Sequence, residues 1–406
     1  MQTAKPKVLA LVMAGGKGTR LHPLTADCCK PALPFGSRHR IVDFVLSNLV
    51  NSQVDAIYLL VQHQSLALIE HVRDTWTWPR LNSRCTVTIV PPQLRDGNES
   101  YQGTADAIAH NLQLVEAHAP DVVAVFAADH VYRMDVRQMV DEHLARAADV
   151  SVASVPVPVQ ECSSVGVVET DAAGWVRRFH EKPQVVRAMP GFGGMALASM
   201  GNYVFSAAAL MRELSRARHP SEVDFGRHTL PRLVESHRVL AHDFMNNRVP
   251  GPQEAARYWR DVGSVDAYFE AHADTLGVDA PFPLANPAWP IHSGSSADEA
   301  AFVEGGAITR SSIGAGCVVR AARLDHALLR CGVRVEDDAR VEHSIVMDRV
   351  FVGRGARLMR TIVDRDNHIP PHEVIGGNPE RDRRRFHVSR SGVVVVPAGH
   401  FRRPAT

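Results

Sequence analysis

The chain of 406 residues is long enough for two or three domains with large cores. Apolar residues make up 45% and charged residues 22% of the chain, which is ordinary for a soluble globular protein. The net charge of +1 gives no electrostatic reason to expect nucleic acid or an anionic membrane as a partner, and no apolar run approaches the roughly 18 residues of a membrane span.

The six cysteines contain no C-x-x-C pair and none of the spacings typical of zinc sites or disulfide frameworks. We therefore expect reduced thiols and a cytoplasmic protein. The apolar run after Lys7 leads straight into glycines rather than into a small-residue cleavage site. We interpret it as a first core strand and not as a signal peptide.

Apolar patterns in the first two-thirds of the chain predict strands that alternate with helices. The expected strands are 7–13, 55–62, 85–92, 121–130 and 149–158, and the expected helices are 40–52, 64–76, 104–119 and 136–148. This alternation predicts an α/β domain with a Rossmann-like, mostly parallel sheet. Ligands of such sheets bind beyond the carboxyl ends of the strands.

A glycine-rich loop, GGKGTR at 15–20, directly follows the first strand. Glycines let backbone amides approach an oxyanion without a Cβ in the way. The loop does not fit a Walker A motif, because Lys17 precedes Gly18, nor a dinucleotide fingerprint, which needs glycine where Leu21 stands. Its two cations favour a loop that holds a polyphosphate, as in nucleotidyl transfer. A purely structural tight turn is the alternative.

The composition changes near residue 276. Residues 277–300 are rich in Pro, Ser, Gly and Ala, which predicts a linker between a first domain (1–276) and a C-terminal domain (301–390) that is followed by a tail (391–406). In the C-terminal domain, branched apolar residues recur every five or six positions at 313, 319, 324, 329, 335, 341, 346, 352, 358, 363, 369 and 375. This spacing is typical of hexapeptide-repeat, left-handed parallel β-helices. An antiparallel sandwich is the alternative.

The motifs GGKGTRL, PLT and KPALPFG together resemble the signature of the sugar-nucleotide pyrophosphorylases. The later segments YQGTADAI, ADHVYRMD, FHEKP, LASMGNYVF, DFGRHTLPRL and YWRDVGS resemble the glucose-1-phosphate adenylyltransferases within that family. The resemblance covers nearly the whole chain. It implies a nucleotidyltransferase domain followed by a left-handed β-helix.

The resemblance also implies a reaction, in which the adenylyl group of ATP is transferred to α-D-glucose 1-phosphate for glycogen or another α-glucan. The products are ADP-glucose and pyrophosphate. Mg²⁺ as cofactor, small-molecule allosteric effectors and a homotetramer are further implications. Two alternatives stay open: a pyrophosphorylase for another base or hexose phosphate, and a non-catalytic regulatory subunit. The second is disfavoured because the expected cations and carboxylates are all present.

Four residues are the expected catalytic groups: Arg20, Lys30, Asp129 and Asp261. Asp129 ends a predicted strand at the catalytic edge of the sheet, although it could instead cap the next helix. Asp261 could instead pair with Arg260. Because Mg²⁺ prefers oxygen ligands, we expect one ion between Asp129 and Asp261. The resemblance assigns Arg20 to the departing phosphates, and Lys30 to charge near the α-phosphate.

The resemblance assigns further residues to the two substrates. The expected nucleotide-binding residues are Gly15, Gly16, Lys17, Gly18, Thr19, Arg20, Gln93, Gly103 and Thr104. The expected glucose 1-phosphate residues are Tyr101, Gly166, Glu181, Lys182 and Ser199. Glu181 is expected to bind sugar hydroxyls and Lys182 the sugar phosphate. Without the resemblance, an exposed Glu-Lys pair would be a solubility feature.

An effector site is expected at Arg40 together with Arg384 and Arg385, and a solvated charge run is the alternative. Regulated relatives carry basic residues between the PLT and KP motifs, where this chain has ADCC. The identity of the effector and a redox role of Cys28 and Cys29 therefore stay open. The histidines show no consistent ligand spacing, so we assign no metal to them.

Overall fold

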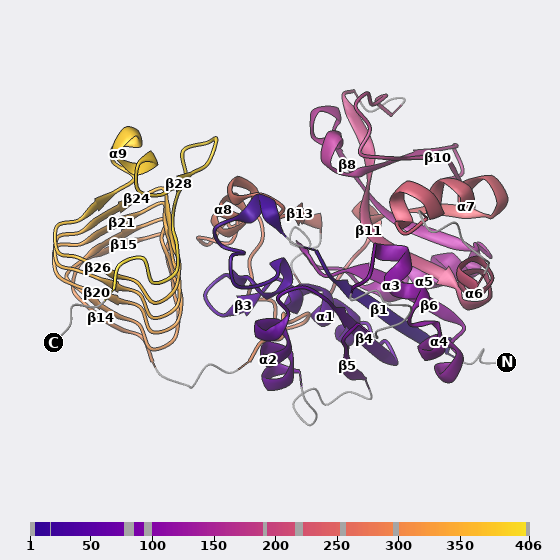
Figure 1. The fold of residues 1–406 in the computed structure, drawn as a ribbon, viewed down its shortest axis with the longest axis horizontal. Coiled ribbons are helices and arrows are strands. Elements are labelled where there is room, and N and C mark those ends of the chain that lie inside the picture. Colours follow the sequence, from indigo (N-terminus) through magenta and orange to yellow (C-terminus); the bar gives the residue numbers. More distant parts are fainter. Residues whose placement is uncertain are drawn as a thin grey trace.

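The structure is a computed structural model that describes residues 5–16, 18–76, 85–92, 100–189, 193–215, 222–251, 257–294 and 300–402. Figure 1 shows two bodies: an α/β domain formed by the first two-thirds of the chain, and a stack of short strands formed by the last third. None of the helices in these ranges is long and apolar enough to cross a membrane.

A parallel unit forms one half of the central sheet. Its strand order is β6-β1-β4-β5, and every pairing in it is parallel. The strands are β1 (Val8–Ala14), β4 (Ala56–Val61), β5 (Thr86–Val90) and β6 (Val122–Ala127). β1 is almost continuously apolar, as a strand buried on both faces requires. This half confirms the predicted α/β architecture.

The other half of the sheet is mainly antiparallel, so the sheet is mixed. β11 (Met195–Ser206) runs antiparallel to β6, and β8 and β9 run antiparallel to β11. The remaining strands are β8 (Val150–Pro158), β9 (Gly166–Thr170), β10 (Val176–Glu181) and β12 (Val239–Asp243). β10 runs antiparallel to β9, whereas β12 runs parallel to β8. Antiparallel strands can follow one another through turns, whereas a parallel return needs a crossover. Besides β9 and β10, the described residues between β8 and β11 contain one short helical turn and no longer crossover helix.

Helices flank the sheet. They are α1 (Val42–Asn51), α2 (Leu66–Thr75), α3 (Thr104–Ala109), α4 (Leu112–His118), α5 (Val136–Ala145), α6 (Ala207–Ser215), α7 (Leu230–Ser236) and α8 (Val265–Ala273). Shorter helical turns are η1 (Thr19–Leu21), η2 (Lys30–Ala32), η3 (Val159–Ser164), η4 (Phe225–Thr229) and η5 (Phe244–Asn246). The helix predicted at 104–119 is interrupted between α3 and α4. There Asn111 leaves helical geometry and its side-chain amide donates to the Ala107 carbonyl at 2.8 Å.

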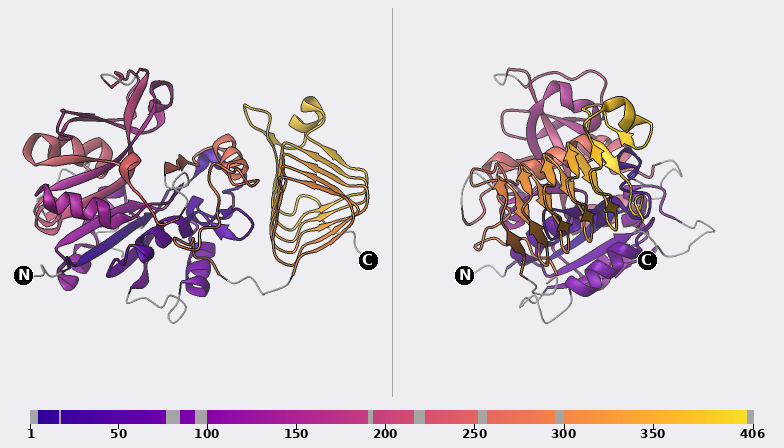
Figure 2. Two further views of the ribbon diagram at one scale, coloured as in Figure 1. Left: turned by 180° about the vertical axis from the view of Figure 1, so that it is seen from behind. Right: turned by 90° about the vertical axis from the view of Figure 1, so that its left-hand side faces the viewer.

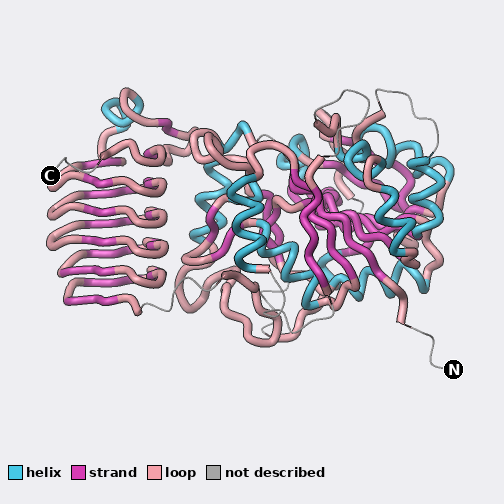
Figure 3. Tube along the Cα trace, turned by 60° about the horizontal axis from the view of Figure 1, so that its bottom comes forward, coloured by secondary structure: helices cyan, strands magenta, loops and turns pink. Residues whose placement is uncertain are grey.

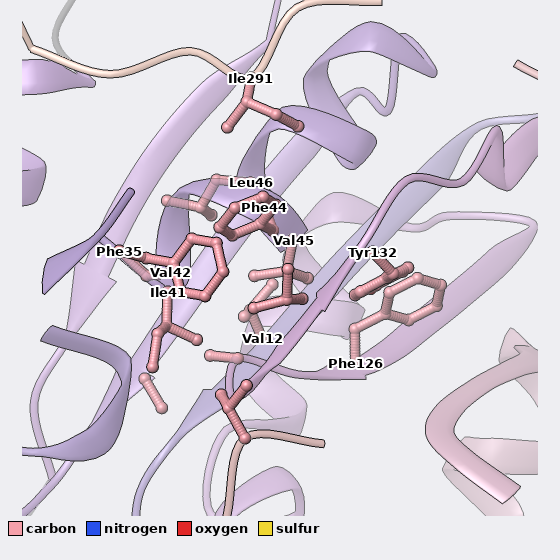
Figure 4. Packing of buried hydrophobic residues seen from close by; sticks show 14 of the residues in the cluster. Val12, Phe35, Ile41, Val42, Phe44, Val45, Leu46, Phe126, Tyr132 and Ile291 are labelled. Carbon is pink, nitrogen blue, oxygen red and sulfur yellow. The ribbon is translucent and has the colours of Figure 1, made fainter. Parts of the chain in front are cut away.

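The largest apolar core lies between α1 and the sheet. Figure 4 shows Phe44 and Val45 of α1 in one buried cluster with Val12 of β1. The same cluster includes Phe35, which belongs to a small hairpin of β2 (Pro34–Phe35) and β3 (His39–Arg40). The hairpin is therefore held against the sheet by the core itself.

The last third of the chain forms three walls of short parallel strands (Figure 3). The first wall contains β14 (Phe302–Glu304), β17 (Val318–Arg320), β20 (Arg334–Val335), β23 (Phe351–Val352) and β26 (His368–Ile369). The second contains β15 (Ala307–Thr309), β18 (Arg323–Asp325), β21 (Arg340–Glu342), β24 (Arg357–Met359) and β27 (Val374–Ile375). The third contains β16 (Ser312–Ile313), β19 (Leu328–Leu329), β22 (Ile345–Val346), β25 (Thr361–Val363), β29 (Val394–Val396) and the antiparallel β28 (His387–Val388). A short helix, α9 (Pro379–Arg383), follows β27.

Apolar side chains of successive coils stack inside these walls. Leu324, Val341 and Leu358 are aligned on the second wall and fully buried. Three apolar steps of five or six residues complete one coil, as the hexapeptide spacing predicts. The arrangement confirms the β-helix and contradicts the antiparallel sandwich.

Two segments that flank the predicted β-helix have structure of their own. β29, buried and paired with β25, lies in the segment predicted as a tail from residue 391. The predicted linker 277–300 has no helix or strand in its described residues 277–294, but its side chains Phe282, Trp289 and Ile291 are buried. This segment packs onto the α/β domain.

The β-helix packs directly against the α/β domain. In Figures 1 and 2 it stands beside α8 and β3. Phe269 and Leu276 of the first domain belong to the same buried apolar cluster as Leu328 and Ile345 of the β-helix. The two domains therefore share a core.

Candidate active site

Two aspartates meet beyond the carboxyl end of β6. Asp129 lies just after this strand, and it is followed by β7 (His130–Tyr132), which pairs antiparallel with β13 (Trp259–Asp261). His130 and Asp261 are opposite each other in that register. The structure thus brings together the two aspartates predicted to share an ion, at the sheet edge where ligands of such folds bind.

Lys30 lies between the two carboxylates. Its Nζ is 3.0 Å from Asp129 Oδ2 and 2.8 Å from Asp261 Oδ1, and its side chain is only 8% exposed. Burial acts to lower the pKa of Lys30, but the two carboxylates outweigh burial and raise that pKa. Burial acts to raise the pKa of Asp129, yet Lys30 and His130 hold it below its ordinary value. Lys30 and Asp129 are therefore both charged at neutral pH.

The place where Asp129 and Asp261 meet around Lys30, which we call the aspartate corner, offers ligands for a divalent cation. Asp129, His130 and Asp261 each present a ligand atom, and these atoms lie within 4.8 Å of one another. His130 was not among the expected site residues; its Nε2 is 3.4 Å from Asp129 Oδ1. Carboxylate oxygens suit Mg²⁺, whereas imidazole suits softer metals. The two aspartates are therefore the fitting ligands for Mg²⁺.

The glycine-rich loop begins at the end of β1. Gly16 has a φ of 120° with open space where a Cβ would lie, and Gly18 has a φ of 56°. Only glycine adopts the first conformation readily, and it takes up the second without steric cost. The Gly18 carbonyl accepts a hydrogen bond from the Thr25 hydroxyl at 2.9 Å, which fixes the loop. Lys17 lies outside the described residues.

Arg20 reaches the aspartate corner from this loop. It lies in η1, which begins at Thr19, and its side chain is exposed. A Cβ on Gly263 would lie 2.8 Å from both Arg20 Nη2 and Asp261 Oδ2. The guanidinium and the carboxylate therefore lie close to each other beside this glycine.

A cavity of about 270 Å³ opens beside the loop. Its lining includes Gly15, Gly16, Gly103 and Thr104, all predicted to bind the nucleotide. A Cβ on Gly103 would lie 2.4 Å from the Val223 carbonyl oxygen, so this turn needs glycine for close backbone approach. Gln93, the remaining residue predicted for the base, lies outside the described residues.

Tyr101 lines this same cavity, although it was predicted to bind glucose 1-phosphate. Its hydroxyl accepts a hydrogen bond from Asn111 at 3.0 Å, and its carbonyl accepts one from Gln62 at 2.8 Å. The structure therefore places Tyr101 beside the residues expected for the nucleotide. Its role stays a prediction.

Three of the predicted sugar residues, Gly166, Glu181 and Lys182, lie together at the Glu181 carboxylate, and we call them the Glu181 group. Lys182 Nζ is 2.7 Å from Glu181 Oε1. A Cβ added to Gly166 would lie 3.2 Å from Glu181 Oε2, and a Cβ added to Gly226 would lie 2.4 Å from the same oxygen. Because neither residue has a Cβ, the carboxylate fits between them.

Ser199 is connected to this group through Tyr203. The Ser199 hydroxyl accepts a hydrogen bond from the Gly201 amide at 3.2 Å. Burial raises the pKa of the Tyr203 phenol, the hydrogen bond with Ser199 opposes this rise, and the charge of Glu181 adds to it. Tyr203 therefore hydrogen-bonds with Ser199 and feels the charge of Glu181.

Asp224 joins the cavity to the Glu181 group, and the sequence analysis did not single it out. It lines the cavity and accepts a hydrogen bond from the Thr104 hydroxyl at 3.2 Å. Its Oδ1 would be 3.4 Å from a Cβ on Gly226. The available signal was the motif DFG at 224–226, an acid close to a glycine, which served only to support the resemblance.

The residues predicted for an effector have separate partners. Arg40 Nη1 donates to the Ala32 carbonyl at 2.5 Å. Arg385 Nη1 lies 2.8 Å from Glu373, and Arg384 is exposed. The joint effector site of these three arginines stays a prediction.

Cys28 and Cys29 are buried free thiols. Burial raises the pKa of Cys28, and it raises the pKa of Cys29 to about 11. The thiolate is the reactive form of cysteine. Because neither thiol ionises at neutral pH, the structure disfavours redox sensing by this pair.

A second group with metal-type ligands, Asp325, His326 and His343, lies on the β-helix. The two imidazole rings stack with centroids 4.6 Å apart and planes 15° apart. The nitrogen lone pairs lie in the ring planes, so two nearly parallel rings do not converge on one ion. We assign no metal to this group.

Comparisons with known proteins agree with this architecture. The nucleotidyl transferase family matches residues 9–277, and the GlmU-like C-terminal hexapeptide family matches residues 297–396. The chain is 45% identical to a glucose-1-phosphate adenylyltransferase of Thermodesulfovibrio yellowstonii, over 97% of this chain and 96% of the relative. It is 44% identical to a glucose-1-phosphate adenylyltransferase of an Anaeromyxobacter species, over 96% of this chain and 98% of the relative. It is 42% identical to one from Corynebacterium jeikeium, over 97% of this chain and 98% of the relative.

The position of Lys30 generates a prediction about cation binding. Its ammonium competes with any divalent cation for the same two carboxylates, so Lys30→Met should bind Mn²⁺ about tenfold more tightly than the unaltered protein at pH 8 without nucleotide. Electron paramagnetic resonance of free Mn²⁺ measures this. Lys182→Met, which removes a lysine paired with Glu181 instead, should leave the affinity unchanged. Equal affinities in all three proteins would contradict competition at this corner.

Proposed function

The chain belongs to the nucleotidyl transferase family and, within it, to the glucose-1-phosphate adenylyltransferases, and we propose from this that it forms ADP-glucose and pyrophosphate from ATP and α-D-glucose 1-phosphate. The observation that carries the proposal is the placement of Lys30 between Asp129 and Asp261, next to the glycine-rich loop. A reaction between two phosphate esters needs such a balance of opposite charges.

The residues of the corner divide the work between the two phosphate groups. We propose that Arg20, with Lys17, holds the phosphates that leave as pyrophosphate, since a guanidinium binds phosphate oxygens bidentately. Lys30 keeps the two aspartates from repelling each other in the free protein. When the nucleotide binds, its α-phosphate offers the Lys30 ammonium a new partner and releases the carboxylates.

Asp129 and Asp261 are the proposed ligands of Mg²⁺. When bound, the ion would reduce the negative charge of the phosphates that react. The fit rests on the two carboxylates, whose ligand atoms lie within 4.8 Å of each other. His130 packs at 5.2 Å from the Trp259 ring and helps to fix this corner.

The sugar phosphate is proposed to bind at the Glu181 group. Glu181 can accept hydrogen bonds from sugar hydroxyls, and Lys182, half-exposed, can turn from Glu181 to the phosphate. Asp224 lies between this group and the nucleotide cavity and is proposed to orient both. Ser199 and Gly166 are proposed to belong to the same binding site.

Several broader properties are proposed on family membership. They are a role in glycogen or α-glucan synthesis, control by small-molecule effectors, assembly as a homotetramer, and a cytoplasmic location.

A substrate panel tests the proposed reaction. Pyrophosphate release should show the highest kcat/KM with ATP and α-D-glucose 1-phosphate among ATP, UTP, dTTP and GTP, each offered with several hexose 1-phosphates. A clear preference for dTTP or UTP would end the adenylyl assignment. If the purified chain turned over no pair at all, the regulatory-subunit alternative would replace it.

Asp129→Asn should lower kcat by about 10³-fold or more with little change in melting temperature, because a charge is lost where the reaction needs it. Steady-state pyrophosphate release measures kcat. Asp141→Asn, on the exposed face of α5, is the matched control and should keep full activity. An unchanged kcat in Asp129→Asn would refute its role in the site.

Lys182→Ala should raise the KM for glucose 1-phosphate by about tenfold or more and lower kcat much less, since the phosphate is bound alike in the ground and transition states. Initial rates at varied concentrations of each substrate measure this split. Arg178→Ala removes a cation of β10, the strand that ends just before Lys182; this side chain is 66% exposed, and its loss should change neither constant. A change confined to the KM for ATP would reverse the pocket assignment.

A further inference from the structure

One buried arginine of the β-helix reaches into the α/β domain. Arg330 follows β19, and its side chain is 6% exposed. Its Nη1 lies 2.7 Å from the Gly36 carbonyl oxygen, 3.1 Å from that of His39 and 3.3 Å from that of Phe35. A single guanidinium thus binds both strands of the β2–β3 hairpin and the turn between them.

The charge of Arg330 is balanced within the β-helix. Its Nε lies 3.0 and 3.2 Å from the two carboxylate oxygens of Asp348 on the next coil. Burial lowers the pKa of His39 to about 4, so His39 adds no second positive charge beside Arg330 at neutral pH. A buried arginine with a paired carboxylate and three carbonyl acceptors is fully committed to this contact.

The hairpin that Arg330 holds continues directly from Lys30. The Ile41 amide donates to the Leu33 carbonyl at 3.1 Å, and the Arg40 guanidinium donates to the Ala32 carbonyl. The Tyr268 hydroxyl of α8 donates to the Pro34 carbonyl. The backbone from Lys30 to the end of the hairpin is therefore tied at several points. From the other domain, the buried Arg330 binds it through three carbonyls, and the Cys331 thiol donates a weaker hydrogen bond to the Ser37 carbonyl at 3.6 Å.

We propose that Arg330 is a positioning residue for Lys30, and that through it the β-helix holds the ammonium between Asp129 and Asp261. The proposal rests on the proposed function, in which Lys30 serves the reaction. It makes the β-helix part of the catalytic apparatus and not only a second domain packed against it. Any movement of the β-helix that withdraws Arg330 would loosen the segment that carries the lysine.

Kinetics of two variants give the first test. Arg330→Ala should lower kcat by about 10- to 100-fold, because a small displacement of a reacting group is costly, while the KM for glucose 1-phosphate changes little. Arg330→Lys keeps the charge but loses the planar fork, and should lower kcat in the same direction, by less. It stands in for Arg330→Ala should the alanine variant not fold. Arg349→Ala is the control, since Arg349 pairs with Asp366, is 63% exposed and should not affect kcat.

A double-mutant cycle with Lys30→Met tests whether Arg330 acts through the lysine. If it does, adding Arg330→Ala to Lys30→Met should cost little further kcat. If the double variant instead lost kcat by the product of the two single-variant factors, the proposal would be overturned, because Arg330 would then act independently of Lys30.

A second readout does not depend on turnover. The chain has five lysines, so protein labelled with ¹³C at lysine Cε gives a spectrum in which Lys30 is assigned by its absence in Lys30→Met. At a fixed pH of 8, the ¹³Cε resonance of Lys30 should shift in Arg330→Lys and in Arg330→Ala, because the ammonium moves relative to the two carboxylates, and it should stay in place in Arg349→Ala. An unchanged Lys30 resonance in both Arg330 variants would overturn the proposal. If the unaltered protein had no turnover, the proposed function would fail while this resonance still decided the positioning role.

Discussion

Two carboxylates held side by side repel each other unless a cation lies between them. The pairing of β7 with β13 forces this situation on Asp129 and Asp261. Lys30 compensates this repulsion, because its ammonium lies within hydrogen-bonding distance of both carboxylates and is largely shielded from water. Each of the three groups comes from a different part of the chain, so the balance of charge exists only in the folded domain. The proposed site for polyphosphate and a divalent cation depends on that balance.

Lys30 has to be held in place, because a flexible ammonium would be solvated by water instead of pairing with the two carboxylates. The structure provides this through the segment that follows it. Pro31 stiffens its start, and Phe35 packs its far end into the core, at 5.2 Å from Phe44 and 4.3 Å from His272. Arg330 then ties the same hairpin to the β-helix. The electrostatics of the site thus depend on packing at the boundary of the two domains.

Local sequence signals predicted the features that repeat or that end a strand. The β-helix could be predicted because its apolar residues recur at each wall, and Asp129 because it follows an apolar strand. Features that depend on distant contacts could not be predicted this way. Asn111 divides a periodic helix by hydrogen bonds to Ala107 and Tyr101, and Asp224 becomes a site residue only when the turn at Gly103 packs against the Val223 carbonyl. The mainly antiparallel half of the sheet likewise follows from which strands come to lie together.

The two kinds of cation in this chain are not interchangeable at the positions that matter. Only five of the 45 lysine and arginine residues are lysines, and they stand at positions 5, 7, 17, 30 and 182. At position 30 a compact ammonium reaches two converging carboxylates at 2.8 and 3.0 Å, whereas a planar guanidinium would need more width. At Arg330 the requirement is the opposite: three carbonyls and a carboxylate lie around the side chain, and only a fork with several donors can serve them. The choice of cation at each place therefore follows from the number and the spacing of the acceptors that surround it.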